Sequence, residues 1–406
     1  TVSIPESVTG IGARAFDGCE LLAEAELSGH IQEIGENAFS CTKVYAPLDS
    51  DTAKMLSRTG GGFVCREYPL LKLKYLFVGG EAISLQVVGA DAASTNIEIP
   101  DSVTSIAPHA FENMTGLTAV DLGSNVESIG EYAFAGSGIT AITLPAGVTD
   151  IPQYAFYNTA ALREFNVLGT VTHIGQFAFY RSGVAGVSFP DGLTTIDSQA
   201  FAYCNQLSSV ILPDSVVNLG TYAFSDCHNL TDVKLSAGLV SLPENVFRYC
   251  IKLSSVSLPE GLRAIGANAF YQDNSLAAVL IPRSVTSIDD NAFLYIEPSQ
   301  LTVYCYHDTA ADTFAQAKSY PIIYLDGDNQ LQGLTIEPVN TDYEINLGIG
   351  HSLELGGLFT VKPQNAPYIA QIVFSSEDAD IAAVDNDNDT LTGLAVGDTR
   401  LVAAFD

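Results

Sequence analysis

The 406-residue sequence contains seven cysteines, which could form disulfides or bind a metal ion. An odd number argues against a closed disulfide framework. Cys19, Cys204, Cys227 and Cys250 each lie three residues after a recurring Phe, and the last three fall in consecutive repeats. Neighbouring strands stack about 4.8 Å apart, which is close enough for a disulfide, but their parallel side chains make the bond geometry awkward. We therefore predict a row of small buried thiols. Cys and His pairs at zinc-ligand spacing do not occur.

Histidine offers little for catalysis. His30, His109, His173 and His228 occupy four different positions of the repeat, so they form no ladder. His173 shares its position with Asp150 one unit earlier, and we predict a surface pair. No Ser or Cys nucleophile is directed at that pair. Phosphate loops and nucleophile elbows are also missing. The sequence therefore predicts no enzyme, no catalytic residue and no cofactor.

One acidic stretch is similar to the start of a calcium-binding loop. It runs Asp385-Asn-Asp387-Asn-Asp389, but Thr390 stands where such a loop needs Gly and Val396 where it needs Glu. A polar turn between two strands is the favoured interpretation. Calcium binding by the three aspartates stays open.

Tyrosine is plentiful, with 18 residues, and tryptophan is absent. Tyr157 and Tyr180 directly follow the recurring Phe, whereas Tyr203 and Tyr249 lie one residue further on. These rings are predicted to form an aromatic band along one edge, where a partner would dock. The alternative is that the rings only pack over the turn and leave their hydroxyls in water. The four tyrosines are the candidate partner-binding residues.

These residues belong to an internal repeat of 22 or 23 residues. An Ala-Phe or Val-Phe pair recurs eleven times, with Phe at positions 16, 39, 111, 134, 156, 179, 201, 224, 247, 270 and 293. Apolar residues precede each Phe by five and by eight positions, and Pro precedes most of them by eleven. A single unit cannot bury its apolar residues, whereas stacked units form one continuous core. The segment 210–212 alternates as a strand, and Pro213 ends its pairing. A solenoid is therefore predicted.

The unit pattern I-P-x-S-V-T-x-I-G-x-x-A-F-x-x-C-x-x-L-x-x-V resembles the BspA-like family of bacterial leucine-rich repeats, over residues 1–42 and 97–301. The resemblance implies a curved solenoid on a secreted or cell-surface protein, often associated with adhesion to host proteins or other cells. It implies no catalytic residues and names no ligand.

Two similar cassettes interrupt or follow the repeats. Lys43-Val44-Tyr45 leads to 50–58, and Thr302-Val303-Tyr304 leads to 308–318. Each predicts a strand and then a helix opened by an Asp or Thr N-cap. Such segments would cap the apolar ends of a solenoid. Two strand-like runs, 73–78 and 83–87, flank Gly79-Gly80 and predict a hairpin that covers the starting edge of the second array.

The fold class that follows is a β-rich leucine-rich-repeat solenoid with short helical capping segments, followed by an all-β immunoglobulin-like sandwich. Residues 1–68 are the tail of a first array with its helical cap. Residues 69–325 are a second array, with a hairpin cap at 69–96, nine repeats and a helical end cap at 302–325. The segment 326–406 resembles a group 2 bacterial immunoglobulin-like domain, through the stretches 374–385 and 391–399. The resemblance implies a further strand after Phe405, so the sequence leaves open whether this domain is truncated.

The composition excludes several classes of partner. Asp and Glu number 47 against 17 Lys and Arg, giving a net charge of −30, so neither nucleic acid nor an anionic membrane surface is a predicted partner. No apolar run is long enough for membrane insertion. The chain opens inside a strand at Thr1-Val2-Ser3, so we expect a piece of a longer protein whose export signal lies outside it.

The predicted function is a non-enzymatic, adhesin-like binding protein, secreted or displayed on a bacterial cell, with an unidentified protein or glycan ligand. The alternative is a structural spacer that displays another domain. The outward strand residues keep this alternative open, because the row from Glu26 to Leu280 is mixed and mostly small. Oligomeric state is not determined by the sequence.

Overall fold

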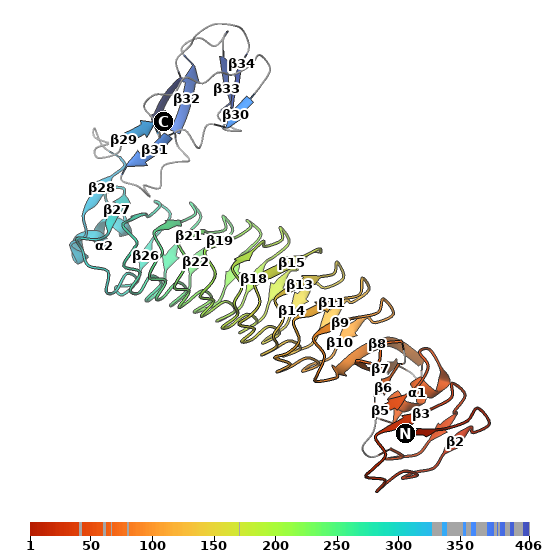
Figure 1. Ribbon diagram of the computed structural model, residues 1–406. Helices are drawn as coiled ribbons and strands as arrows, with labels where there is room; N and C mark the ends of the chain where they lie inside the picture. The colour runs from red at the N-terminus through yellow and green to blue at the C-terminus, as the bar shows by residue number, and fades with distance from the viewer. Residues whose placement is uncertain are drawn as a thin grey trace.

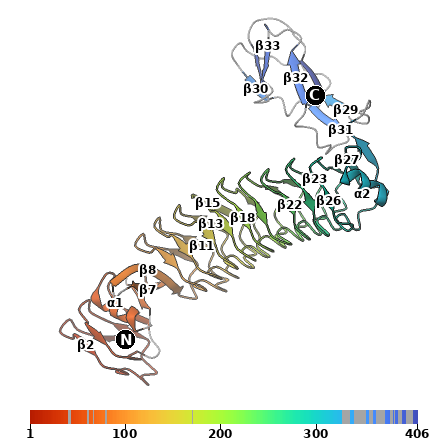
Figure 2. The ribbon, with the colours of Figure 1, turned by 180° about the vertical axis from the view of Figure 1, so that it is seen from behind.

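A computed structural model gives the architecture of the chain (Figure 1). It describes residues 1–326 apart from 40–42, 60–61, 66, 79–80 and 170. Beyond residue 326 it describes 335–338, 352–354, 359–362, 372–376, 380, 382–385, 390–393 and 401–405. Figures 1 and 2 both show the repeat units stacked side by side along one axis, so the predicted solenoid is confirmed.

Each unit between residues 96 and 288 contributes two short strands. Strands of neighbouring units pair in parallel within several runs of units, and each run forms a separate sheet. The first strand buries its central apolar residue and exposes the two beside it, as Ile97 does between Asn96 and Glu98. The first strands are β9 (Asn96–Glu98), β11 (Ala119–Asp121), β13 (Ala141–Leu144), β15 (Glu164–Val167), β17 (Gly186–Val187), β19 (Ser209–Ile211), β21 (Asp232–Lys234), β23 (Ser255–Ser257) and β25 (Ala278–Leu280).

The second strand of each unit holds the apolar residue that lies five positions before the recurring Phe. These strands are β10 (Ser105–Ile106), β12 (Ser128–Ile129), β14 (Asp150–Ile151), β16 (His173–Ile174), β18 (Thr195–Ile196), β20 (Asn218–Leu219), β22 (Ser241–Leu242), β24 (Ala264–Ile265) and β26 (Ser287–Ile288). Pairing is in register, with Ile174 opposite both Ile151 and Ile196. Like residues therefore stack on like residues.

The recurring Phe side chains form the centre of the core. From Phe111 to Phe293 all nine are at most 1% exposed. Their neighbouring ring centroids lie 4.9–5.8 Å apart, with interplanar angles of 4–23°. Each ring is thus buried mainly by the equivalent rings of the units before and after it. The predicted continuous core of the stacked units is confirmed.

The N-terminal part holds two strand ladders and a helix. Strands β1 (Val2–Ser3), β3 (Glu24–Glu26) and β5 (Lys43–Tyr45) form one ladder, and β2 (Gly10–Ile11) and β4 (Glu33–Ile34) form the other. Helix α1 spans Asp51–Arg58. Its N-cap is Ser50, which accepts a hydrogen bond from the Ala53 N–H; the predicted Asp or Thr cap is therefore wrong for this helix. Asp51 instead lies in the first turn, where its negative charge interacts favourably with the positive end of the helix dipole.

A hairpin joins the two sets of repeats. Strand β6 (Phe63–Val64) pairs with β7 (Leu71–Val78), and β7 pairs with β8 (Glu81–Ala90), both antiparallel. Strand β8 then pairs in parallel with β10. One sheet consequently runs β1-β3-β5-β6-β7-β8-β10-β12, from the first-strand ladder of the early units to the second-strand ladder of the later ones. The hairpin thus covers one starting edge, at β10, while β9 remains an edge strand.

The far end of the repeats is closed by β27 (Thr302–Cys305), α2 (Ala310–Lys318) and β28 (Ile322–Tyr324). Thr309 caps α2, as predicted for this helix, by accepting a hydrogen bond from the Asp312 N–H. Phe314 of α2 lies 5.8 Å from Phe293, between ring centroids, and extends the Phe ladder by one ring. Tyr320 donates a hydrogen bond to the Phe293 carbonyl. The helix therefore covers the last apolar unit.

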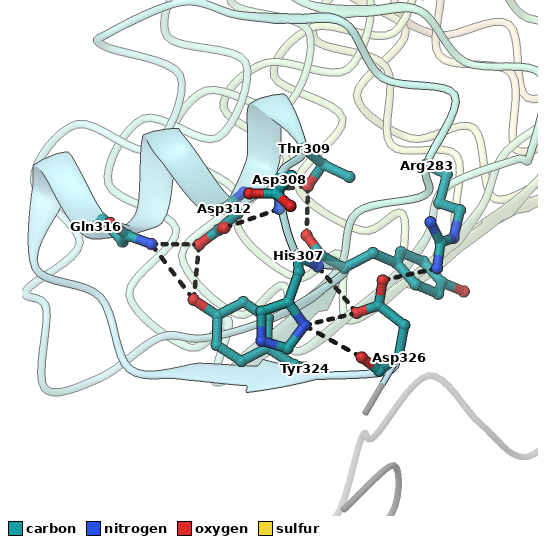
Figure 3. A network of polar contacts seen from close by, with 9 residues as sticks. Arg283, His307, Asp308, Thr309, Asp312, Gln316, Tyr324 and Asp326 are labelled. Carbon is teal, nitrogen blue, oxygen red and sulfur yellow. Dashed lines mark hydrogen bonds and ion pairs between the residues drawn. The ribbon is translucent and has the colours of Figure 1, made fainter. Parts of the chain in front are cut away.

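A polar network holds the chain where it leaves this cap (Figure 3). The His307 ring stacks on Tyr324, and its Nδ1 lies 3.0 Å from an Asp326 carboxylate oxygen. Arg283 donates to the other Asp326 oxygen at 2.7 Å. The Tyr324 hydroxyl donates to Asp312 on α2. Hydrogen bonds with Asp326 raise the pKa of His307. The network fixes Asp326 to both the last repeat and the cap.

Beyond Asp326 the described residues form seven strands that pair in antiparallel fashion. They are β29 (Thr335–Pro338), β30 (Ser352–Glu354), β31 (Phe359–Lys362), β32 (Ile372–Ser376), β33 (Ala382–Asp385), β34 (Thr390–Gly393) and β35 (Leu401–Phe405). The pairs form three separate groups, β29-β31, β30-β34-β33 and β32-β35. Residues 387 and 389 of the possible calcium loop lie outside the described residues.

Candidate functional site

The four candidate tyrosines lie on the turn that follows the second strand of each unit. All four side chains are half-buried, so none of them belongs to the core. Each lies one or two residues beyond a fully buried Phe, which anchors the turn to the core. The backbone close to that Phe includes left-handed residues: Tyr203 and Tyr249 adopt positive φ angles of 61° and 60°. The core therefore fixes where these rings emerge.

Hydrogen bonds between units hold the turn rigidly. The N–H groups of Tyr154, Phe156 and Asn158 donate to carbonyls of the next unit at 3.1, 2.8 and 2.7 Å. The same pattern recurs in the following unit, from Phe177 onward. Because every turn is bonded to its neighbour, each unit presents its side chains at nearly the same height and spacing.

Three of the four candidate rings come together. Tyr157 and Tyr180 stack with ring centroids 5.4 Å apart and planes 4° apart. Tyr180 and Tyr203 meet edge to face at 5.2 Å. Tyr249 lies two units beyond Tyr203 and belongs to a second tyrosine group, Tyr249, Tyr271 and Tyr295, whose neighbouring centroids are 5.2 and 5.1 Å apart.

A second row of rings was not predicted from the sequence. His109, Tyr132, Tyr154 and Phe177 form a continuous stack with centroid distances of 5.0, 4.5 and 4.9 Å. All four lie two residues before the recurring Phe, a shared position that the sequence does display. The two rows touch edge to face, at Tyr154–Tyr157 and Phe177–Tyr180. We call the combined surface the aromatic edge: His109, Tyr132, Tyr154, Tyr157, Phe177, Tyr180 and Tyr203.

Two arginines cover rings of these surfaces. The Arg181 guanidinium carbon lies 5.4 Å from the ring centroids of both Tyr180 and Tyr203. Arg248 lies 4.9 and 4.8 Å from Tyr249 and Tyr271 in the second tyrosine group. Cation–π contacts of this kind hold the guanidinium over the ring face. Among the described residues neither arginine has a carboxylate within ion-pair distance.

Two tyrosine hydroxyls of the aromatic edge, those of Tyr132 and Tyr203, have raised pKa values. Burial, followed by the nearby Asp226 carboxylate, raises the pKa of Tyr203 above its ordinary value. Burial also raises the pKa of Tyr132, together with its hydrogen bond to Tyr154. These hydroxyls can therefore donate as well as accept hydrogen bonds to a ligand.

Comparison with known proteins identifies the family to which these repeats belong. A family model described as a BspA type leucine-rich repeat region matches residues 1–47, 90–204 and 172–298, in six copies. Together these matches cover more than half of the chain. The chain belongs to the BspA-type leucine-rich repeat family. The family description names a repeat region and no enzymatic activity.

Solved structures of bacterial leucine-rich repeat proteins resemble the chain. A protein from Bacteroides ovatus is 21% identical, with a TM-score of 0.53, over 80% of this chain and 92% of its own. That likeness shows the shared fold. A leucine-rich cell surface protein from Faecalibacterium prausnitzii is 26% identical, with a TM-score of 0.38, over 80% and 90% of the two chains. No curated protein matches the sequence.

The strand face of the BspA-type repeats is the other broad surface. Its outward residues from Glu98 to Ser257 are exposed, as the alternation predicts, and Ile211 is the most apolar of them at 60% exposure. The row carries no aromatic ring. It offers a partner fewer large contacts than the aromatic edge does.

His173 bridges two carboxylates on the second-strand ladder. Its Nδ1 lies 2.8 Å from Asp150, the predicted partner, and its Nε2 lies 2.9 Å from Asp197. Because carboxylates only accept, both ring nitrogens must carry a proton. Burial alone would lower the pKa of His173, but the hydrogen bonds with Asp197 and Asp150 outweigh it and the net shift is upward. The group braces three units and has no nucleophile among its partners.

This brace predicts a pH-dependent contribution to stability. A raised pKa in the folded state means that the contribution is complete below the ordinary value of 6.5 and is lost as pH rises through the folded value. We expect His173→Gln to remove that dependence. The measurement is the unfolding midpoint between pH 5.5 and 8.5, with His30→Gln at an exposed position as the control. Parallel pH curves for the wild type and His173→Gln would contradict the bridge.

The predicted thiol row is confirmed in its buried part. Cys204, Cys227 and Cys250 are free and fully buried, and each S–H donates to a Phe carbonyl of the preceding unit at 3.1–3.2 Å. Burial raises the pKa of all three thiols, that of Cys227 to about 12. Cys19 shares their position in the repeat but is exposed. Because the thiolate is the reactive form, the buried thiols are expected to be inert.

Thiol labelling tests this assignment. In the native, unreduced protein at neutral pH, a maleimide should modify Cys19 and leave Cys204, Cys227 and Cys250 unlabelled. After denaturation without reductant all three should react. Peptide mass spectrometry reads both states. A disulfide among the three would refute the free-thiol assignment.

Asp273 occupies the next place in the thiol row and was not singled out from the sequence. It is 0% exposed, and both carboxylate oxygens lack a hydrogen-bond partner among the described residues. Burial raises the pKa of Asp273 well above its ordinary value. Burial therefore favours the neutral, protonated form of the side chain, against a smaller opposing effect of the Cys250 backbone.

In the described part of the chain, no group of three or more His, Cys, Asp or Glu side chains is arranged to hold a metal ion. No helix of that part is long and apolar enough to cross a bilayer. The aromatic edge remains the surface with the most distinctive chemistry.

Proposed function

We propose that the chain is a non-enzymatic binding protein with an adhesin-like role, which recognises a protein or glycan on a host or neighbouring cell through its aromatic edge. The observation that carries the proposal is a row of half-buried rings on a rigid scaffold, with Arg181 held over two of them. Tyr and Arg supply much contact energy for little lost side-chain entropy. Tyr157, Tyr180 and Tyr203 are the proposed contacts on the aromatic edge. Tyr249 is the proposed contact in the second tyrosine group.

We further propose that the protein is secreted or displayed on a bacterial surface. Two observations support this location. The family model is that of BspA-type repeats, and one similar structure is described as a cell surface protein. The net charge of −30 also suits a protein exposed to solvent, because strong like charge opposes self-association.

The proposed organisation has three parts: residues 1–68 as the tail of one array with α1, residues 69–325 as a second array, and residues 326–406 as an immunoglobulin-like domain. The sheet that passes through β7 and β8 supports a hairpin junction between the arrays. The antiparallel pairing of β29 to β35 supports a β-domain after residue 326. In this organisation the last part serves as a spacer between the repeats and the cell.

Adhesion of the whole chain tests the proposed function. Beads coated with the protein are applied to fixed epithelial cells and to immobilised extracellular-matrix proteins. The edge variant combines Tyr157→Ser, Tyr180→Ser, Tyr203→Asn and Tyr249→Asn. These replacements match residues that other units carry at the same positions, Ser225 and Asn158, so the turns should fold normally. We expect the edge variant to lose adhesion by about tenfold or more.

A strand-face variant is the matched control. It combines Thr143→Ala, Ser188→Ala, Ile211→Ser and Lys234→Ala, and it should adhere as the wild type does. Equal adhesion of the edge variant and the wild type would exclude the aromatic edge. Loss only in the strand-face variant would move the site to that face. Absence of adhesion in every form would favour the spacer role, which the small, mixed strand face is also compatible with.

A further inference from the structure

Arg181, which covers two rings of the aromatic edge, has the geometry of an anion-binding group. It lies in the row of Asn158 and Tyr203, two residues after the recurring Phe, at a φ angle of 57°. Its N–H donates to the Ala202 carbonyl at 2.9 Å, which fixes its backbone. The guanidinium rests on Tyr180 and Tyr203 and is solvent-exposed. Its donors are therefore oriented and still available.

The turn segments around Arg181 lack the acidic residues that are frequent in the rest of the molecule. The three consecutive turn segments 153–158, 176–181 and 198–203 contain no Asp or Glu, although the whole chain carries 47. The equivalent segments on either side do contain acids, Glu131 before and Asp226 after. Asp150 and Asp197, which precede the first and third segments, are both bonded to His173. Arg181 is thus the one charged side chain of these three turn segments, with the Asp226 carboxylate beyond them near Tyr203.

From these observations we propose that the centre of the aromatic edge binds an anionic glycan, with a sugar carboxylate or sulfate seated on Arg181. The inference rests on the proposed function and names its ligand class. A guanidinium offers a planar pair of N–H donors that matches a carboxylate or sulfate. The hydroxyls of Tyr157, Tyr180 and Tyr203 and the amide of Asn158 would bond to sugar hydroxyls beside it.

The arrangement of the rings favours a glycan over a protein segment. Rings stacked along the solenoid axis cover one another's faces and present edges and hydroxyls outward. A protein partner generally needs a pocket for an apolar anchor. Two cavities of the described residues instead lie at the hairpin, lined by residues between Ile34 and Asp121. A regular row of polar groups, spaced about one sugar unit apart, suits a linear polymer of sugars.

Binding of the whole chain to immobilised oligosaccharides tests the inference. Three probes share one neutral backbone: unmodified, carboxylated and sulfated. The wild type should bind one or both acidic forms about tenfold more tightly than the neutral form. Comparison of the two acidic arms identifies the anionic group. The preference should shrink in high salt, because Arg181 is exposed to screening.

Arg181→Gln is the decisive variant, since Gln272 already occupies the same position in a later unit. It should abolish the preference for acidic probes, whereas Arg263→Gln, an exposed arginine outside the turn segments, should retain it. A wild type that binds all three probes equally, or none, overturns the inference, as does an Arg181→Gln variant that keeps the preference. The proposed function is judged separately: cell adhesion that depends on the tyrosines but survives removal of cell-surface glycans leaves it intact and refutes the glycan.

Discussion

Replacing Phe224 by Ala is expected to cost about 3–5 kcal/mol of local stability. Phe224 is fully buried, with neighbouring rings Phe201 and Phe247 at centroid distances of 5.3 and 5.8 Å. Removing the ring leaves a cavity that two rigid neighbours cannot fill. Because repeat units couple mainly to their neighbours, the loss should appear first as opening of the adjoining units.

Denaturant unfolding, combined with hydrogen exchange of the flanking units, measures this effect. Ile211→Ala is the control, because Ile211 is 60% exposed and its loss should change stability by no more than about 0.5 kcal/mol. A Phe224→Ala variant with an unchanged unfolding midpoint would contradict the buried ladder.

Replacing Asp273 by Asn or by Cys is expected to stabilise the protein by about 1–3 kcal/mol at pH 4, the usual cost of a buried polar group without a partner, and by more as the pH rises. Asp273→Cys supplies the residue found at this position in the three preceding units, where the S–H bonds to a Phe carbonyl. Asp273→Asn keeps the shape and adds a donor. Both variants remove the requirement to bury a titratable carboxyl.

The pH dependence gives this prediction its sign. The folded pKa of Asp273 is raised, so its contribution to stability is complete below the ordinary value of 3.8 and is lost as pH rises toward the folded value. Between those limits the wild type should lose about 1.4 kcal/mol per pH unit relative to Asp273→Asn. Unfolding midpoints at pH 4, 5.5, 7 and 8.5 measure the difference. Asp191→Asn, at an exposed position, should show none of it. A gap between wild type and Asp273→Asn that stays constant with pH would sink the assignment.

The repeat explains why so much of the fold could be predicted. Each unit must bury the same positions against its neighbours, so eleven units report one pattern independently. The burial of the Phe series, the pairing of Asp150 with His173 and the free thiols all follow from shared position alone. Contacts between residues at different positions of the repeat could not be predicted in this way. Asp197 reaches His173 from two residues beyond the paired position, which depends on side-chain reach.

The junction and the site were predicted less completely. The change of ladder at β8 depends on how the hairpin turns in space, and no repeat position encodes it. Three candidate tyrosines do meet, but the adjoining stack that ends at Phe177 was missed although its members share one position. Asp273 was missed for a related reason. It is the one carboxylate in a row of cysteines, so the repeated residue type at this position does not indicate it.

The central claim is that partners bind at the aromatic edge, and footprinting tests it most directly. Hydroxyl-radical labelling of the whole chain, free and adhering to fixed epithelial cells, reports the surface that binding covers. Oxidation of Tyr157, Tyr180 and Tyr203 should fall on adhesion, while that of Ile211 and Lys234 on the strand face should not. Protection confined to the strand face, or unchanged labelling of all three tyrosines in the bound state, would contradict the claim.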